Sequence, residues 1–258
     1  MGKPVGRALC LLAVVLAWGC ASPEERFEKH VSNAEEYLEQ EQQLEALIEY
    51  RSALKLQPQN AEINFQIAEI ARVLFALADA VFYYRETHRL DPERIDAAML
   101  EAQLLMFNDP ERVSEIIEAG LLRAPNDPLV HLARSQQALT ERDTKEALSA
   151  ARTAIELNGN LSSAWMQVGR VHQARIREAR LIDEVVPDTS IFEAAIAAFE
   201  KAHALDDRYV GALVERARVY GTWPGHEDET EQAYRESVEF AEKQGNTDAI
   251  VATADAAR

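Results

Sequence analysis

The chain repeats itself about every 34 residues, and this periodicity constrains the fold more than any other feature of the sequence. The first series of small side chains is Ala34, Ala68, Ala102, Ser135, Gly169 and Ala217. A second series in register with it is Ala46, Ala80, Val113, Ala147, Ala195 and Ala233. Self-similarity at this period is typical of a solenoid built from one repeated supersecondary unit, each of which buries its apolar face against its neighbours.

Two further series identify the repeated unit as a helical hairpin. Four residues after the second series, one helical turn on, come Tyr50, Tyr84, Ile117, Ala151, Phe199 and Ser237. Eight residues later come Pro58, Pro92, Pro125, Gly159, Asp207 and Gly245, mostly residues that stop a helix. Small residues let two helices approach each other, and the larger residue one turn later fills the gap between successive hairpins.

These spacings resemble the tetratricopeptide repeat (TPR). The best-matching unit is Ala34-x2-Tyr37 followed by Ala46-x3-Tyr50-x2-Ala53-x4-Pro58, and Trp165-x3-Gly169 supplies the aromatic–glycine opening of another. The resemblance covers about residues 27–245. It implies an all-α fold, a right-handed TPR solenoid of about six helical hairpins with a short C-terminal helix.

The predicted organisation is one solenoid domain between two short ends. The six predicted units are 27–60, 61–94, 95–127, 128–161, 162–209 and 210–246. Residues 247–258 follow as a C-terminal cap or as the first half of a seventh unit. Units three and four depart from the pattern, because Glu101 and Arg134 occupy positions where a hydrophobic residue is usual, and His131 one where an aromatic residue is usual.

Two insertions lie between the helices of their hairpins. In unit five, Arg175 to Ile182 predicts a continuing helix, and a loop then ends in a helix cap at Ser190 with Glu193 three residues later. Unit six carries four extra residues within Gly221–Glu229, a run that contains Trp223. Tolerated drift in loop length is the favoured explanation, and a partner-contacting ridge with an exposed Trp223 is the alternative.

The N-terminus predicts a signal peptide of lipoprotein type over residues 1–19. Lys3 and Arg7 precede about ten apolar residues, too few to span a membrane. The following Ala17-Trp18-Gly19-Cys20 resembles the lipobox of bacterial lipoproteins, although Leu16 lies one position early and Trp18 replaces a small residue. The resemblance implies lipidation of Cys20, a tether over 20–26, and sorting to the outer membrane facing the periplasm. Ordinary cleavage to a soluble secreted protein is the alternative.

Composition and motifs argue against catalysis and against nucleic acid. The net charge of −17 repels phosphate backbones. No glycine-rich phosphate loop, nucleophile elbow or zinc motif occurs, so we expect no enzyme activity, no catalytic residues, no cofactor and no metal. The acidic run His226-Glu227-Asp228-Glu229 lacks calcium-loop spacing and is better explained as the first turn of a helix.

The TPR resemblance implies that the first helices line a groove for a peptide or helix. Carried onto this chain, the groove positions are Phe65, Glu69, Arg72, Met99, Gln103, Met106, Leu132, Gln136, Leu139, Met166, Arg170, Gln173 and Arg218. Methionine suits adaptable apolar contacts. The alternative for some of these residues is packing between adjacent first helices. The lysine and asparagine clamp of cytosolic co-chaperones is absent.

The sequence therefore predicts a non-catalytic cell-envelope lipoprotein that docks other proteins in its groove. It resembles the outer-membrane TPR lipoproteins of type IV pilus assembly, which implies a scaffold for an envelope system such as a pilus or secretion apparatus. The expected partners are envelope proteins through the groove and the membrane through the lipid at Cys20. The alternative is a periplasmic lipoprotein that holds an apolar ligand for a transporter.

Overall fold

Twelve α-helices and no strand are found in the residues that the structure describes. The structure is a computed structural model, and it describes residues 22–181, 187–207 and 210–245. The predicted signal peptide over 1–19, the lipidation site Cys20 and the predicted cap over 247–258 lie outside these residues. The all-α architecture predicted from the periodicity is confirmed.

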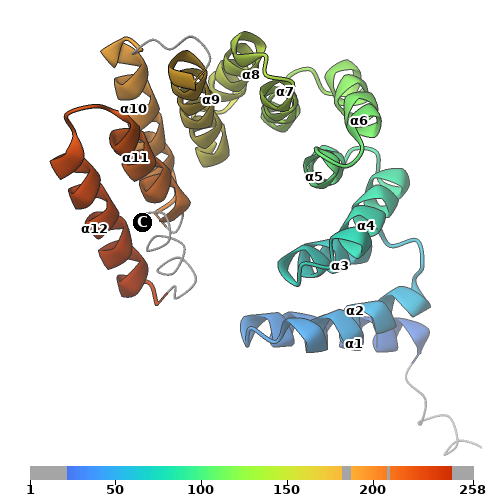
Figure 1. The fold of residues 1–258 in the computed structure, drawn as a ribbon. Helices are drawn as coiled ribbons and strands as arrows, with labels where there is room; N and C mark the ends of the chain where they lie inside the picture. Colours follow the sequence, from blue (N-terminus) through green and yellow to red (C-terminus); the bar gives the residue numbers. More distant parts are fainter. Residues whose placement is uncertain (1–21, 182–186, 208–209, 246–258) are drawn as a thin grey trace, which may run out of the picture. The chain divides into compact units, whose positions relative to one another are not determined.

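Consecutive helices pair as antiparallel hairpins (Figure 1). The six hairpins are α1 (Pro23–Glu39) with α2 (Gln43–Leu56), α3 (Ala61–Val73) with α4 (Leu77–Leu90), α5 (Ile95–Leu105) with α6 (Pro110–Arg123), α7 (Pro128–Thr140) with α8 (Thr144–Leu157), α9 (Ser162–Leu181) with α10 (Thr189–Leu205), and α11 (Val210–Thr222) with α12 (Glu227–Lys243). Each of the six predicted repeat units contains one of these hairpins, although α1 begins four residues before the first unit.

The hairpins fall into two compact units, where the sequence predicted one solenoid domain. Unit 1, residues 1–94, contains α1–α4, and unit 2, residues 95–258, contains α5–α12. Repeat proteins divide in this way because each hairpin packs only on its immediate neighbours rather than around one central core. Within unit 1 the core includes Phe27, Tyr50 and Ile67. Within unit 2 separate clusters form around Ile117 and Phe199.

Short polar side chains cap the N-termini of half of the described helices. Ser22 and Glu25 form a capping box at α1, with Ser22 Oγ accepting from the Glu25 N–H at 3.0 Å and Glu25 Oε2 accepting from the Ser22 N–H at 2.7 Å. Asn60 and Asp143 cap α3 and α8 with their side-chain oxygens, which accept from backbone N–H groups of the first turn. The cap of α10 is Asp188, whose carboxylate accepts from the Ser190 N–H at 2.8 Å, so the prediction of Ser190 as the cap was wrong.

The three periodic series occupy the interior. Every member of the two small-residue series is buried, and so is every residue one turn after the second series. The closest approach is at Gly169, where a Cβ atom would lie 2.5 Å from Cε1 of the Phe199 ring. Helix α9 therefore approaches α10 this closely only because Gly169 has no side chain.

Two of the residues that depart from the repeat pattern, Glu101 and Arg134, are held by polar contacts between the two helices of a hairpin. Glu101 is buried in α5 and lies 3.4 Å from Nε of Arg112 on α6. Arg134 on α7 donates to Glu146 on α8 at 3.2 Å. Ser135 donates to the Ala147 carbonyl at 2.7 Å, which satisfies its buried hydroxyl. His131 contacts the Pro125 carbonyl at 2.7 Å.

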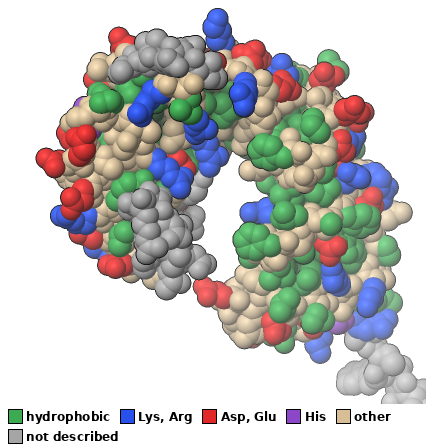
Figure 2. Space-filling view, viewed as in Figure 1, with side chains coloured by type: hydrophobic (Ala, Val, Ile, Leu, Met, Phe, Trp, Pro, Cys, Tyr) green, Lys and Arg blue, Asp and Glu red, His purple; other side chains and the backbone are tan. Residues whose placement is uncertain are grey.

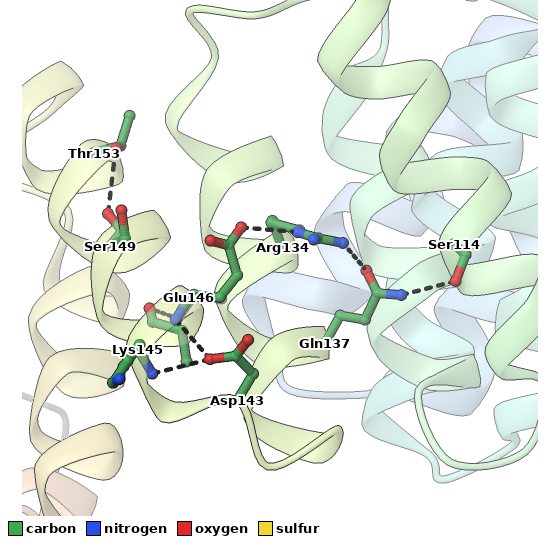
Figure 3. A network of polar contacts seen from close by, with 10 residues as sticks. Ser114, Arg134, Gln137, Asp143, Lys145, Glu146, Ser149 and Thr153 are labelled. Atoms are coloured by element: carbon green, nitrogen blue, oxygen red, sulfur yellow. Dashed lines mark hydrogen bonds and ion pairs between the residues drawn. The ribbon is translucent and has the colours of Figure 1, made fainter.

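Figure 3 shows how one of these contacts extends across helices α6, α7 and α8. Arg134 also donates to Gln137 at 3.3 Å, and Gln137 donates to the Ser114 hydroxyl at 2.7 Å. Gln137 is buried, so these bonds satisfy a polar group that would otherwise cost stability in the interior. The network joins successive hairpins, which indicates a structural role.

Both insertions are ordered where the structure describes them. α9 continues to Leu181 and has 20 residues, against 13 in α7 and α11, as the sequence predicted. In the second insertion the Trp223 ring stacks between Phe192 and His226, with centroid distances of 4.9 and 3.9 Å. Trp223 is half-buried, so its ring packs within this loop. It is not the exposed residue of a partner-contacting ridge that the alternative interpretation expected.

Gly169→Ala is expected to lower the free energy of unfolding of unit 2 by about 1–3 kcal/mol, because the added methyl group collides with the Phe199 ring. Urea unfolding followed by tryptophan fluorescence measures the effect, since Trp165 and Trp223 both lie in unit 2. The matched control is Gly159→Ala, whose new Cβ has a nearest neighbour at an ordinary 3.7 Å. Equal stability of the two variants would contradict the close-packing argument.

His172 on α9 gives a pH-dependent contribution to stability. The side chain is buried with Nδ1 unpartnered among the described residues, and burial, reinforced by Arg175 and Arg152, lowers its pKa to about 4. The unfolded chain therefore binds this proton more readily than the folded chain does. The contribution is fully present above the ordinary histidine pKa of 6.5 and is lost as the pH falls toward about 4.

Between about pH 7 and pH 5, this loss amounts to about 1–2 kcal/mol. His172→Gln removes the titrating group, so its free energy of unfolding is expected to fall less than that of the wild type over the same interval. Urea unfolding at both pH values measures the difference, and the carboxylates common to both proteins cancel. Identical pH dependence would show that the His172 proton does not contribute.

Candidate functional site

In unit 1 the predicted groove residues form hydrogen bonds, an ion pair and ring contacts with one another and with nearby side chains of the same repeat. Tyr84 donates a short hydrogen bond to Glu69, and Arg72 lies 2.7 Å from the same carboxylate. Burial and the Glu69 hydrogen bond raise the pKa of Tyr84 well above its usual range. Phe65 contacts the Tyr84 ring edge-on at 5.8 Å, and the Arg94 guanidinium lies 4.0 Å from the Phe65 ring centroid. Phe65, Glu69 and Arg72 therefore belong to one local network.

In unit 2 the apolar groove positions are largely core. Met99, Met106, Leu132 and Met166 are exposed by only 6, 7, 8 and 3% of their surface. Met99 and Met106 belong to the cluster around Ile117, and Met166 to the cluster around Phe199. These four side chains therefore follow the packing alternative, because neighbouring hairpins cover them. Gln103 is exposed and Gln136 is half-buried, and their role in a groove stays a prediction.

The structure brings three other predicted positions together in a hollow between first helices. Leu139 on α7 and Arg170 and Gln173 on α9 border a cavity of about 570 Å³. Its polar lining also includes Arg142 in the α7–α8 turn, Arg177 further along α9 and Glu215 on α11. Arg142 adopts a left-handed backbone conformation, with φ of 64°, in this tight turn.

A second hollow of about 680 Å³ lies between α9, α11 and α12. It shares Gln173, Arg177 and Leu181 with the first, so the two hollows adjoin along the C-terminal half of α9. Arg180, Arg218 and Tyr234 line its other parts. We call the two hollows together the arginine groove. In Figure 2 lysine and arginine side chains gather over the region of α9.

The arginine groove carries an excess of positive charge. Five arginines line it, Arg142, Arg170, Arg177, Arg180 and Arg218, against two acidic residues, Glu178 and Glu215. The Glu215 carboxylate already accepts two hydrogen bonds, from Gln173 at 2.9 Å and from Arg218 at 2.6 Å. Arg180 donates to the Thr222 carbonyl at 2.6 Å. The Tyr234 hydroxyl is protonated at neutral pH, and burial raises its pKa further above the ordinary value of 10.0.

Sequence reasoning missed Arg142, Arg177 and Arg180. The signal was present in the basic run Arg175–Arg180 of the first insertion, which the sequence identified only as extra helix. Arg142 carried no such signal, because it faces the groove through the geometry of a turn in a different hairpin.

The described residues contain no group of histidine, cysteine, aspartate and glutamate arranged to hold a metal ion. Within the same ranges no helix has both the length and the apolarity needed to cross a membrane. Glu227, Asp228 and Glu229 occupy the first turn of α12, where negative charge favours the helix N-terminus.

Comparisons with known proteins identify the fold. No protein-family model matches the chain. Over 173 residues it is 24% identical to human protein O-mannosyl-transferase TMTC1, a match that covers 61% of this chain and 19% of that protein. The chain thus spans about a fifth of the length of this curated relative.

Two solved structures resemble the chain over most of its length. The human IFIT1 dimer with PPP-AAAA matches with a TM-score of 0.64 at 17% identity, over 92% of this chain and 59% of that one. PilW, a widely conserved type IV pilus biogenesis factor, matches with a TM-score of 0.62 at 13% identity, over 88% and 97%. These neighbours are TPR-repeat proteins, so the likeness shows a TPR-type fold.

Proposed function

We propose that the chain is a non-catalytic scaffold that docks segments of other envelope proteins on the first-helix face of unit 2. The observation that carries this proposal is the pair of adjoining hollows along α7, α9 and α11, which leaves exposed polar side chains facing an open space. Stacked first helices present such a surface because each repeat adds one helix to the same face. The likeness to PilW supports an envelope system such as a pilus or secretion apparatus.

The proposed location is the outer membrane, facing the periplasm, with the chain anchored by a lipid on Cys20. The sequence Ala17-Trp18-Gly19-Cys20 supports this location through its resemblance to a lipobox. A chain with a net charge of −17 gains no attraction from anionic headgroups, so the anchor has to supply the attachment.

The apolar-ligand alternative has less support. It depended on an apolar groove of methionine and leucine, yet Met99, Met106, Leu132 and Met166 are buried between helices. The two hollows of the arginine groove instead combine five arginines, a glutamine and several threonines with the apolar Leu139, Ile176 and Leu181. Such a lining suits a polar segment better than an apolar ligand.

Photo-crosslinking in living cells tests the scaffold proposal. A photoreactive amino acid at Arg170, on the arginine groove, is expected to give an adduct with a discrete envelope protein that mass spectrometry identifies. The same amino acid at Glu118, an equally exposed residue of α6, is the matched control and is expected to give no such adduct. In the Cys20→Ser background the adduct is expected to weaken several-fold, because the untethered chain is diluted away from the membrane.

Two results would count against the scaffold proposal, and a third would count against the lipid anchor alone. Equal adducts from both positions would show non-specific contact. Lipid adducts alone would favour the ligand-binding alternative, and an unchanged adduct with Cys20→Ser would remove the lipid anchor while leaving the scaffold.

A further inference from the structure

We propose that the arginine groove binds a segment of the partner protein that carries several carboxylates. This inference rests on the proposed function, because it names the chemistry of the docked segment. It begins from three arginines, Arg142, Arg170 and Arg177, which are exposed and line the groove. Within the described ranges none of their guanidinium groups forms an ion pair or a hydrogen bond.

This lack of partners is shared by Arg152 and Arg175 in a separate hollow, but it contrasts with three other arginines of the same unit. Arg112, Arg134 and Arg216 each contact a carboxylate of another helix. The chain has 44 acidic residues and only 27 basic ones, so acidic partners are abundant. A group of unpartnered arginines on one surface of such a chain is a local reversal of the overall charge, and it attracts an acidic ligand at short range.

The shape of the guanidinium group also determines which kind of acidic group fits the arginine groove. A guanidinium presents a planar fork of donors that matches a carboxylate in a bidentate pair. Gln173, Thr140 and Tyr234 supply neutral polar groups between the arginines, which suit the backbone of an extended segment. Two adjoining hollows of about 570 and 680 Å³ accept successive side chains of such a segment.

A long phosphate polymer fits this surface less well than a short acidic segment. Glu178 and Glu215 lie in the groove itself, and the chain as a whole carries a charge of −17. A nucleic acid that extends beyond the arginines would therefore meet repulsion along most of its length. A peptide confines its carboxylates to the groove and avoids that repulsion.

The experiment titrates the full chain with a fluorescein-labelled peptide in which glutamate and serine alternate, followed by fluorescence anisotropy. A peptide with glutamine in place of glutamate is the uncharged control probe. We expect saturable binding of the acidic peptide and none of the glutamine peptide. Binding is expected to weaken several-fold between about 50 and 500 mM salt, as exposed charge pairs are screened.

The double variant Arg170→Gln with Arg177→Gln is expected to weaken the acidic peptide at least about tenfold, because two charge-assisted contacts are lost. Arg152→Gln with Arg175→Gln removes the same charge from a separate hollow next to α8 and is the matched control. We expect it to weaken binding by less than about twofold, through long-range electrostatics alone. Because the groove arginines hold no described partner, the groove variant should keep the wild-type melting temperature, which circular dichroism checks.

Binding of the glutamine peptide, or equal weakening by both double variants, would overturn the inference. Tighter binding of PPP-AAAA or of phosphatidylglycerol vesicles than of the acidic peptide would assign the groove to phosphate instead. The in-cell crosslink separates this inference from the proposed function. An envelope adduct that survives Arg170→Gln with Arg177→Gln, with the photoreactive residue at Gln173, would keep the scaffold and reject the acidic segment.

Discussion

Close approach of helices at one small residue in each repeat is the constraint on which the described structure depends. Each of the six first helices places alanine, serine or glycine at this position, and every one of these residues is buried. At Gly169 even a methyl group is excluded by the Phe199 ring, and at Ser135 the hydroxyl is accepted only because it bonds to the Ala147 carbonyl. Because hairpins pack only on their neighbours, these contacts hold the chain together one repeat at a time.

The arginine groove is a consequence of that packing combined with one extended helix. Stacking aligns α7, α9 and α11 on one face, and the insertion in α9 adds the turns that carry Arg177 and Arg180. The tight α7–α8 turn brings Arg142 to the same hollow. The buried carboxylate of Glu101 is paired with Arg112. The exposed arginines of the groove, Arg142, Arg170 and Arg177, instead face open space. A charge can stay unpaired there because solvent, and by our proposal a ligand, compensates it.

Much of the fold followed from local sequence. Period and residue size predicted six hairpins and their buried small positions, because helix contact excludes large side chains whatever the details of the neighbours. Helix ends were predicted less well, since several short polar residues compete for one cap. At α10 both Asp188 and Ser190 have the right chemistry, and only the course of the backbone decides for Asp188.

The sequence by itself determined the repeat, the helical hairpins and the extension of α9. Only the tertiary structure decided which first-helix residues face solvent. Met99, Met106, Leu132 and Met166 occupy positions at which a groove was expected, but neighbouring hairpins cover them. Conversely, Arg142 and Arg177 belong to different hairpins, and stacking alone places them on one hollow. Periodicity specifies the face of a helix on which a residue lies, whereas exposure depends on the distance and size of residues that are remote in the chain.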